Sequence, residues 1–160
     1  MSSVALRYGV VLLAVLAIGL VAGSLLGTGM VGISAKGLPE EMWTRSFQLE
    51  DALFAKAMPP LFLTTLAALL VSCFVTRGSA RGLFVAATVF MLVVLIVSVR
   101  GEVPLNKQIQ TWIPGAAPAN WADIRDRWLA NHLIRTIAGL FGFVCAAVGL
   151  AKMPREAVRA

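Results

Sequence analysis

The 160-residue chain has little charge, one histidine and two cysteines. Only 14% of its residues are charged, whereas a soluble domain carries about a quarter, and 59% are hydrophobic. Cys73 and Cys145 both lie within apolar runs, where a free cysteine usually acts as a small hydrophobe. This residue supply argues against a tetrahedral zinc site and indicates no disulfide. The composition instead favours an integral membrane protein.

The net charge of +6 does not by itself indicate a nucleic-acid partner. The sequence contains no zinc-finger spacing and no soluble basic domain, and the cytoplasmic flanks of membrane proteins also collect Lys and Arg. We therefore expect the lipid bilayer to be a partner and nucleic acid not to be one.

Four apolar segments are long enough to cross a bilayer core of about 30 Å at about 1.5 Å per helical residue. They lie at about residues 8–33, 59–76, 82–99 and 121–150. The tight basic turn at 77–82 makes the second and third segments antiparallel neighbours. Strand alternation and a second domain are absent from the pattern. The sequence predicts an all-α fold, an antiparallel bundle of four transmembrane helices forming a single integral membrane domain of residues 1–160.

The connection between the first two spans has two interpretations. Its Leu-Pro-Glu-Glu start is typical of a helix, with Pro in the first turn followed by acids. Apolar residues then recur at helical spacing, beside Trp43, Phe47 and Phe54: Leu38, Met42, Leu49 and Leu53. The segment is either a short interfacial helix or an extension of the second span. The Pro-Pro pair at residues 59–60 predicts a break or kink, and residues 100–120 are predicted to be a polar loop.

The first span carries Gly19, Gly23 and Gly27, four residues apart. Glycines at this spacing share one helix face and let a neighbouring helix approach closely. This stripe is a candidate surface for a homo-oligomer.

Charge in the short flanks predicts the orientation. The N-terminal flank, the 77–82 turn and the C-terminal tail contain a single acid, Glu156, whereas the two longer loops mix acids and bases. The basic residues in these flanks are Arg7, Arg77, Arg81, Lys152, Arg155 and Arg159. Because such residues mark the cytoplasmic side, we expect a multi-pass protein of a bacterial plasma membrane with both termini in the cytoplasm.

The fourth span begins with an unusual set of polar residues. One face combines residues spaced by three and four, namely Arg125, Trp128, His132, Arg135, Gly139 and Gly142. Arg127 and Asn131 lie on the adjacent stripe. Arg135 is about 20 Å along the helix from its expected start. Ionisable groups at membrane depth are costly and normally face the bundle interior or a wet cavity. They either tie helices together or form a site.

The segment before this span supplies further candidates. Glu102 is a possible counter-ion for one of the arginines, and Pro104 would direct Asn106 towards the bundle. A simple loop anchor is the alternative. Trp112, Trp121 and Trp128 are either interfacial anchors of an aromatic belt or part of a site.

These motifs resemble those of a known family. The Glu-x-Pro-x-Asn segment at residues 102–106, the tryptophan-rich linker and the Arg-Trp-x-x-Asn-His-x-x-Arg-Thr sequence at 127–136 resemble the anthrone oxygenase-like family of small four-helix membrane proteins. The family often has Asn at the position of Glu102, so this residue departs from the pattern.

The resemblance implies an oxidoreductase that converts an anthrone, a flat apolar aromatic molecule, to an anthraquinone with dioxygen. It implies that neutral His132 is the base. Arg135, with Arg127 or Asn131, would stabilise the developing enolate oxygen. The expected catalytic residues are His132, Arg135 and Asn131, and the expected substrate-binding residues are Arg127, Trp128, Asn106, Glu102 and Trp112. No cofactor or metal is expected, and the substrate would enter from the lipid.

Two other classes stay open. The bundle could bind haem or a single metal ion through His132, although the sequence has no Cys-x-x-Cys-His motif. It could also be a non-enzymatic scaffold or transport subunit that binds an anionic lipid or metabolite.

Overall fold

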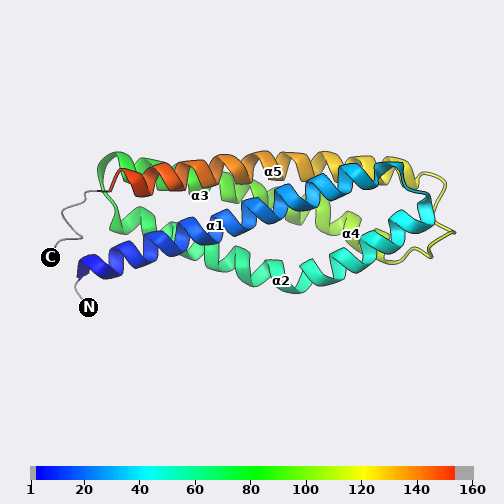
Figure 1. Cartoon of the computed structure of the whole chain (residues 1–160), viewed down its shortest axis with the longest axis horizontal. Helices are drawn as coiled ribbons and strands as arrows, with labels where there is room; N and C mark the ends of the chain where they lie inside the picture. The colour runs from blue at the N-terminus through cyan, green and yellow to red at the C-terminus, as the bar shows by residue number, and fades with distance from the viewer. Residues whose placement is uncertain (1–2, 154–160) are drawn as a thin grey trace.

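The structure is a computed structural model and describes residues 3–153. It is an elongated bundle of long helices (Figure 1). Helix α1 is Ser3–Ser34, α2 is Glu40–Val75, α3 is Gly78–Val97 and α5 is Trp121–Ala151. A short 3₁₀ turn, η1 (Ala35–Gly37), joins α1 to α2, and a π-helical turn, η2 (Ser98–Glu102), leads from α3 into α4 (Val103–Gln110). The described part of the chain contains no strand, which confirms the predicted all-α class.

Four helical stretches are long and apolar enough to cross a membrane: Val4–Gly37, Glu40–Val75, Gly78–Gln110 and Trp121–Ala151. This matches the predicted number and order of spans. By length and composition the chain is an integral membrane protein.

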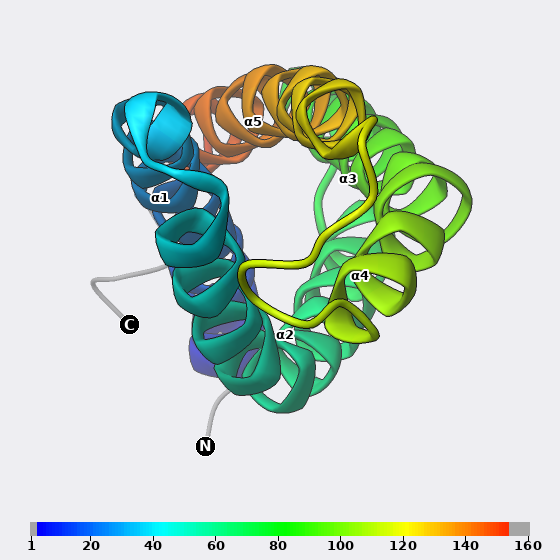
Figure 2. The same cartoon turned by 90° about the vertical axis from the view of Figure 1, so that its right-hand side faces the viewer.

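The helices form a ring around the bundle axis. Viewed along that axis, α2 lies between α1 and the α3–α4 stretch, and α5 closes the ring between α3 and α1 (Figure 2). The start of α1, the α2–α3 turn and the end of α5 lie at one end of the bundle (Figure 1). The opposite end contains η1, the beginning of α2 and the loop at residues 111–120. Helices α2 and α5 therefore face each other across the bundle.

Glycines on α5 allow its neighbours to pack closely. A Cβ at Gly142 would lie 3.0 Å from Ile18 of α1 and 3.3 Å from Phe90 of α3, and one at Gly149 would lie 3.0 Å from the Phe84 ring. Because glycine has no side chain, the neighbouring helices can approach α5 closely at these positions. Around these contacts lies the larger apolar core, in which Ile18 and Phe84 are fully buried.

The three glycines of the α1 stripe do not lie on one exposed surface. A Cβ at Gly19 would lie 3.1 Å from the Phe143 ring, so this glycine packs within the bundle. Gly23 and Gly27 are exposed and have no neighbour within 4 Å. The predicted homo-oligomer stays a prediction, now limited to Gly23 and Gly27.

Helix α2 settles the two interpretations of the first connection. It runs without interruption from Glu40 to Val75, so the segment before the prolines is a helical extension of the second span, while the membrane-spanning start at about residue 59 stays a prediction. Pro59 and Pro60 lie inside the helix, which bows outward along its middle (Figure 1). The bend is expected, because each proline removes one hydrogen bond of the helix.

The inward face of α2 is aromatic. Trp43 and Phe47 are buried, whereas Leu49 and Leu53 are 76% and 67% exposed. The leucine stripe that the sequence brings out therefore faces outward, towards the region of lipid or headgroups.

The predicted loop at residues 100–120 is wrong for its first half. After η2, α4 continues the helix to Gln110, and only residues 111–120 form a loop. Pro104 fits because it lies in the first turn of α4, where an N–H is not needed for helical hydrogen bonds. The π-turn η2 ends at Glu102, whose side chain is buried within the bundle.

The two ends of the described chain lie at the same end of the bundle, as predicted, while the side of the membrane on which they lie stays a prediction. Arg155, Glu156 and Arg159, which supported the predicted orientation, lie outside the described residues.

A leucine at Gly142 should destabilise the bundle, because its side chain would collide with Ile18 and Phe90. Overpacking of this kind costs about 1–3 kcal/mol. Thermal unfolding in detergent should show a clearly lower Tm for Gly142→Leu. The matched variant Gly23→Leu, whose new side chain meets open space, should unfold near the parent temperature, and equal losses from both variants would contradict the packing.

Candidate functional site

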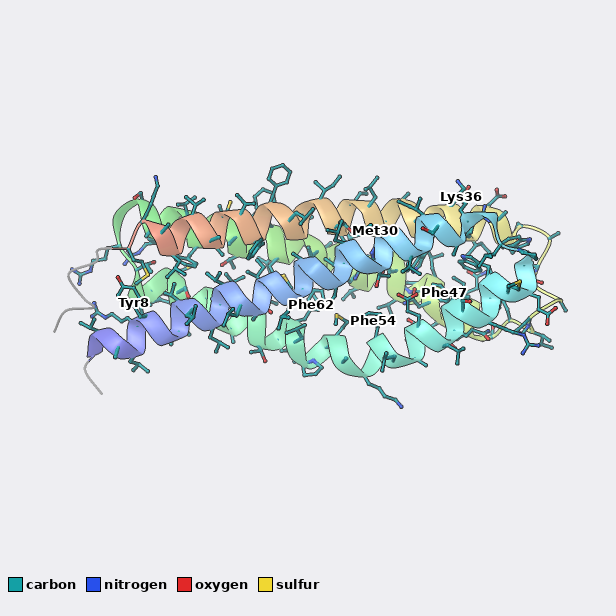
Figure 3. All side chains as sticks on the ribbon, viewed as in Figure 1. Tyr8, Met30, Lys36, Phe47, Phe54 and Phe62 are labelled. Carbon is teal, nitrogen blue, oxygen red and sulfur yellow. The ribbon has the colours of Figure 1, made fainter. Side chains whose placement is uncertain are left out.

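A cavity of about 660 Å³ lies in the half of the bundle that contains η1 and α4. This volume is within the range of about 300–1,000 Å³ typical of ligand sites. Its walls come from α1, α2, the α3–α4 stretch and α5, and they are mainly apolar. Three aromatic side chains of α2 line it, Phe47, Phe54 and Phe62, and Figure 3 shows them spaced along that helix. The cavity exists because α2 bows away from α5.

Three ionisable side chains meet in the wall of this cavity. Glu102, from the end of η2, forms an ion pair with Arg135 of α5 through Oε2 and Nη1. Its other oxygen, Oε1, lies 3.2 Å from Nδ1 of His132. The exposed fractions of these side chains are only 4% for Glu102, 11% for Arg135 and 4% for His132. The counter-ion role predicted for Glu102 is therefore present in the structure, with Arg135 as its partner.

The second ring nitrogen of His132, Nε2, forms a hydrogen bond within the protein. Nε2 lies 2.8 Å from the carbonyl oxygen of Leu25 on α1. Because a carbonyl oxygen only accepts, Nε2 carries a proton and donates it. The close approach of α1 depends on Gly29, where a Cβ would lie 3.3 Å from His132 Cδ2. Nδ1 is consequently the ring nitrogen left for acid–base chemistry.

Polar atoms of this cluster are buried without hydrogen-bond partners. Within the described residues they are Oε1 of Glu102, Nδ1 of His132 and Nε of Arg135. Native proteins satisfy most buried polar atoms, so each exception needs an explanation, such as a catalytic role or a ligand. All three residues line the cavity, so a bound molecule can reach their side chains.

Trp128 is held between the cluster and a polar clamp. Its ring stacks on His132 with the centroids 4.9 Å apart, and it meets Phe47 edge-on at 5.3 Å. Its Nε1–H donates to Oδ1 of Asn106 at 2.9 Å. Asn106 in turn donates to Asp51 of α2 at 2.6 Å, and Gln110 donates to the same carboxylate at 2.8 Å. Asn106 thus points back into the bundle, as the sequence predicted.

The other predicted tryptophans form a separate aromatic cluster beyond the cavity. Trp112 and Trp121 pack around Trp43, with ring centroids 6.4 Å and 5.9 Å from it. Gln48 donates to the carbonyl oxygens of Ile109 and Trp112, which fastens α2 to the end of α4. Trp112 is buried here and does not line the cavity, so its predicted place in the substrate site is not where the structure puts it.

Arg125 lies on the predicted face but ties helices together. It donates to the carbonyl oxygen of Lys36 at 2.9 Å, pairs with Asp126 at 3.0 Å and lies over the Trp121 ring. These contacts fasten α5 to η1. Arg125 thus ties helical segments together, which is the alternative to a site role given for the ionisable residues of this face.

Arg127 and Asn131 lie on the other side of α5. They line a second, smaller cavity of about 380 Å³ next to Arg100 and Gly101. The amide of Asn131 packs on Gly101, where an added Cβ would lie 2.8 Å from Nδ2. The structure therefore does not bring these two residues to the cluster. A helix turns about 100° per residue, so a residue next to His132 in the sequence points in a different direction from His132.

The acidic side of the cavity was not predicted from the sequence. Glu50 and Asp51 of α2 line it, as do Ser24 and Thr28 of α1. The signal for α2 was the sequence Phe47, Asp51, Phe54 and Met58, spaced by four, three and four residues, which puts a carboxylate on an aromatic helix face. The signal for α1 was weaker, because isolated hydroxyls are common in membrane helices.

Fold and site together define a small four-helix integral membrane protein with a buried Glu–His–Arg cluster beside an apolar cavity. Residues 43–145, which include the cluster and the clamp, match the family model described as anthrone oxygenase. The chain belongs to this family, as its motifs predicted. No curated protein and no solved structure matches the chain.

Breaking the Glu102–Arg135 pair from one side should cost more than removing it. Glu102→Gln leaves a buried guanidinium without its counter-ion, which typically costs about 3–5 kcal/mol. The double variant Glu102→Gln/Arg135→Gln should recover part of that loss. Denaturant unfolding in micelles measures the difference.

The matched control is Arg45→Gln, since Arg45 pairs with Glu41 on the surface. Exposed pairs contribute at most about 1 kcal/mol, so this variant should unfold like the parent. A double variant as unstable as the sum of its two single variants would contradict the buried pair.

Proposed function

We propose that the protein is a membrane-embedded oxidoreductase that oxidises an anthrone, a flat and largely apolar aromatic ketone, with dioxygen. The observation that carries the proposal is the Glu102–His132–Arg135 cluster, buried in the wall of a mainly apolar cavity of about 660 Å³. Family membership supports the reaction class.

The first step is removal of a proton from the substrate carbon opposite its carbonyl group. Because Nε2 of His132 donates to Leu25, the proton goes to Nδ1. The resulting imidazolium is stabilised by Oε1 of Glu102, 3.2 Å away. In a catalytic triad the acid pairs with the ring nitrogen opposite the one that takes the proton. Here Oε1 of Glu102 lies beside the same nitrogen, Nδ1, and its role is to stabilise the imidazolium that forms. The base is thus a His–Glu pair rather than a lone histidine.

Deprotonation moves negative charge onto the substrate oxygen, and Arg135 is the cation next to it. Its Nη1 is paired with Glu102, but its Nε–H has no partner and remains free to donate. A preorganised donor in a water-poor site stabilises a developing oxyanion strongly. Arg127 and Asn131, predicted to share this role, line the other cavity and are left out of it.

The electrons and atoms balance without a further oxidant. The carbanion transfers electrons to dioxygen and forms a carbon–oxygen bond, and uptake of a proton gives a hydroperoxide. The oxygen–oxygen bond then breaks as the same carbon loses its second hydrogen as a proton. One oxygen atom becomes the new quinone carbonyl and the other leaves as water.

The lining suits a flat aromatic molecule. Phe47, Phe54 and Phe62 lie along one wall, and Trp128 lies beside His132. Aromatic rings pack well in offset or edge-on contact with other rings. The clamp of Asp51 and Asn106 holds Trp128 in place, so this wall is preorganised for a ligand.

His132→Ala and Arg135→Ala should each abolish most of the oxidation of an emodin-type anthrone by membranes that contain the protein. Loss of a general base or an oxyanion donor typically lowers kcat by about 10²–10⁴-fold. Oxygen uptake and quinone absorbance measure the rate, after subtraction of the spontaneous oxidation. Arg100→Ala removes an exposed arginine outside this cavity and serves as the control. Unchanged rates for both cavity variants would refute the assignment.

A haem or metal role for His132 fits the site less well. Nε2 donates to the Leu25 carbonyl oxygen and has no lone pair for a metal, and Nδ1, the base of the proposed reaction, lies 3.2 Å from the Glu102 carboxylate. Among the described residues no group of three or more His, Cys, Asp or Glu side chains is arranged to hold a metal ion. A non-enzymatic anion site is also disfavoured, because Glu50, Asp51 and Glu102 all line the same cavity.

Purified protein should therefore show no Soret band and no stoichiometric metal. Visible absorption and elemental analysis of the detergent-solubilised protein give this result directly. A Soret band that disappears in His132→Ala would replace the proposed chemistry with haem ligation.

A further inference from the structure

The cavity opens along a slit between α2 and the η2–α4 stretch. Several residues line the cavity and are also exposed on the outer surface, which makes them the rim of its opening. On α2 they include Ala55, Pro59 and Leu63, and on the facing side Val99 and Val103. Leu63, Val99 and Val103 are 69%, 57% and 41% exposed. These five residues are apolar, whereas Lys107 and Gln110, which also line the cavity and are exposed, lie at the other end of the slit.

The same slit is closed near the loop end of the bundle. Asp51 accepts hydrogen bonds from Asn106 and Gln110 across the gap, and Gln48 donates to the backbone of α4 beyond it. Together these contacts join α2 to α4 side by side. The slit therefore has a polar end that is fastened and an apolar end that is open.

The two ends lie in different surroundings. The apolar stretch of α2 begins at Leu61, and that of the third span ends at Val99. Leu63 and Val99 therefore lie just within these stretches, and Ala55, Pro59 and Val103 lie just beyond them, where hydrocarbon gives way to headgroups. Asp51, Lys107 and Gln110 lie further towards the polar end of the bundle, where water and headgroups are found. The open end consequently faces lipid and the fastened end faces water.

We propose that the ligand enters the cavity sideways from the bilayer, between Ala55 and Leu63 of α2 and Val99 and Val103 of the facing stretch, while the Asp51 clamp closes the route from water. The occupant, a lipid-dissolved aromatic molecule, rests on the proposed function. Val103 and Ala55 are among the apolar residues that border this entrance. Charged or strongly hydrated molecules are excluded because reaching the entrance would cost them their hydration.

Cysteine labelling tests the route without any turnover. The full-length chain carries Cys73→Ala, Cys145→Ala and Ser24→Cys, since Ser24 lines the cavity from α1. In vesicles it is treated with N-phenylmaleimide, which is flat and lipid-soluble, or with a quaternary-ammonium methanethiosulfonate, which is charged and water-soluble. Mass spectrometry follows the extent of labelling. We expect the lipid-soluble probe to react and the charged probe to react at least about tenfold more slowly, which corresponds to about 1.4 kcal/mol.

Rim variants identify the entrance. Val103→Trp should slow labelling by N-phenylmaleimide about tenfold, a difference of about 1.4 kcal/mol, and Val103→Ala should accelerate it. Val89→Trp, on an exposed part of α3 that does not line the cavity, is the matched control and should leave the rate unchanged. Asp51→Ala unfastens the clamp and should admit the charged probe.

Equal labelling by both probes in the parent, or rates that do not respond to either Val103 variant, would overturn the lateral entrance. The result is separable from the proposed reaction. If the labelling follows the expected pattern while no anthrone is oxidised, the entrance stands and the oxidoreductase proposal falls.

Discussion

The interaction on which the rest depends is the buried Glu102–Arg135 pair with His132 beside it. Placing a charged side chain within an apolar bundle costs several kcal/mol unless a partner compensates it. This constraint joins the π-turn after α3 to the middle of α5. The carbonyl oxygen of Leu25 adds α1 to the same point, so three helices converge on one cluster. Within the described residues, Oε1 of Glu102 and Nε of Arg135 have no hydrogen-bond partner in the protein.

The cavity lies between the Glu102–His132–Arg135 cluster and helix α2. Among the described residues, none from α2 pairs with Glu102 or Arg135. Helix α2 is instead fastened to α4 through Asp51 and Gln48, nearer the loop end of the bundle than the cluster. It bows outward near Pro59 and Pro60. A helix held near its start and bent further along leaves space next to the cluster. Aromatic rings from α2 and Trp128 line that space, so the charged groups face an apolar chamber. Electrostatic interactions are stronger in such surroundings than in water, which is the condition that base-catalysed carbanion chemistry needs.

Much of this was predictable from periodicity and composition. Runs of apolar residues predicted four spans, and the spacing of Trp128, His132 and Arg135 predicted a shared face. Glu102 was a sound candidate because a buried arginine requires a carboxylate, and the segment that contains Glu102 precedes the fourth span on the same side of the membrane. The predictions for Asn131, Arg127 and Trp112 were less successful. A residue one position from a good candidate looks similar in sequence, yet it points about 100° away around the helix, and an aromatic residue can fill an aromatic cluster as readily as a site.

The sequence by itself determined the class of the protein, the order of its spans and the polar face of the last one, because these depend on local hydrophobicity and helical spacing. Only the tertiary structure decided that Asp51 meets Asn106, that Leu25 occupies one nitrogen of His132, and that the cavity opens between α2 and α4. The first two contacts join residues more than fifty positions apart. They depend on how the helices are placed against one another: Pro59 and Pro60 predict that α2 bends, but the local sequence gives neither the direction of the bend nor the π-turn at residues 98–102.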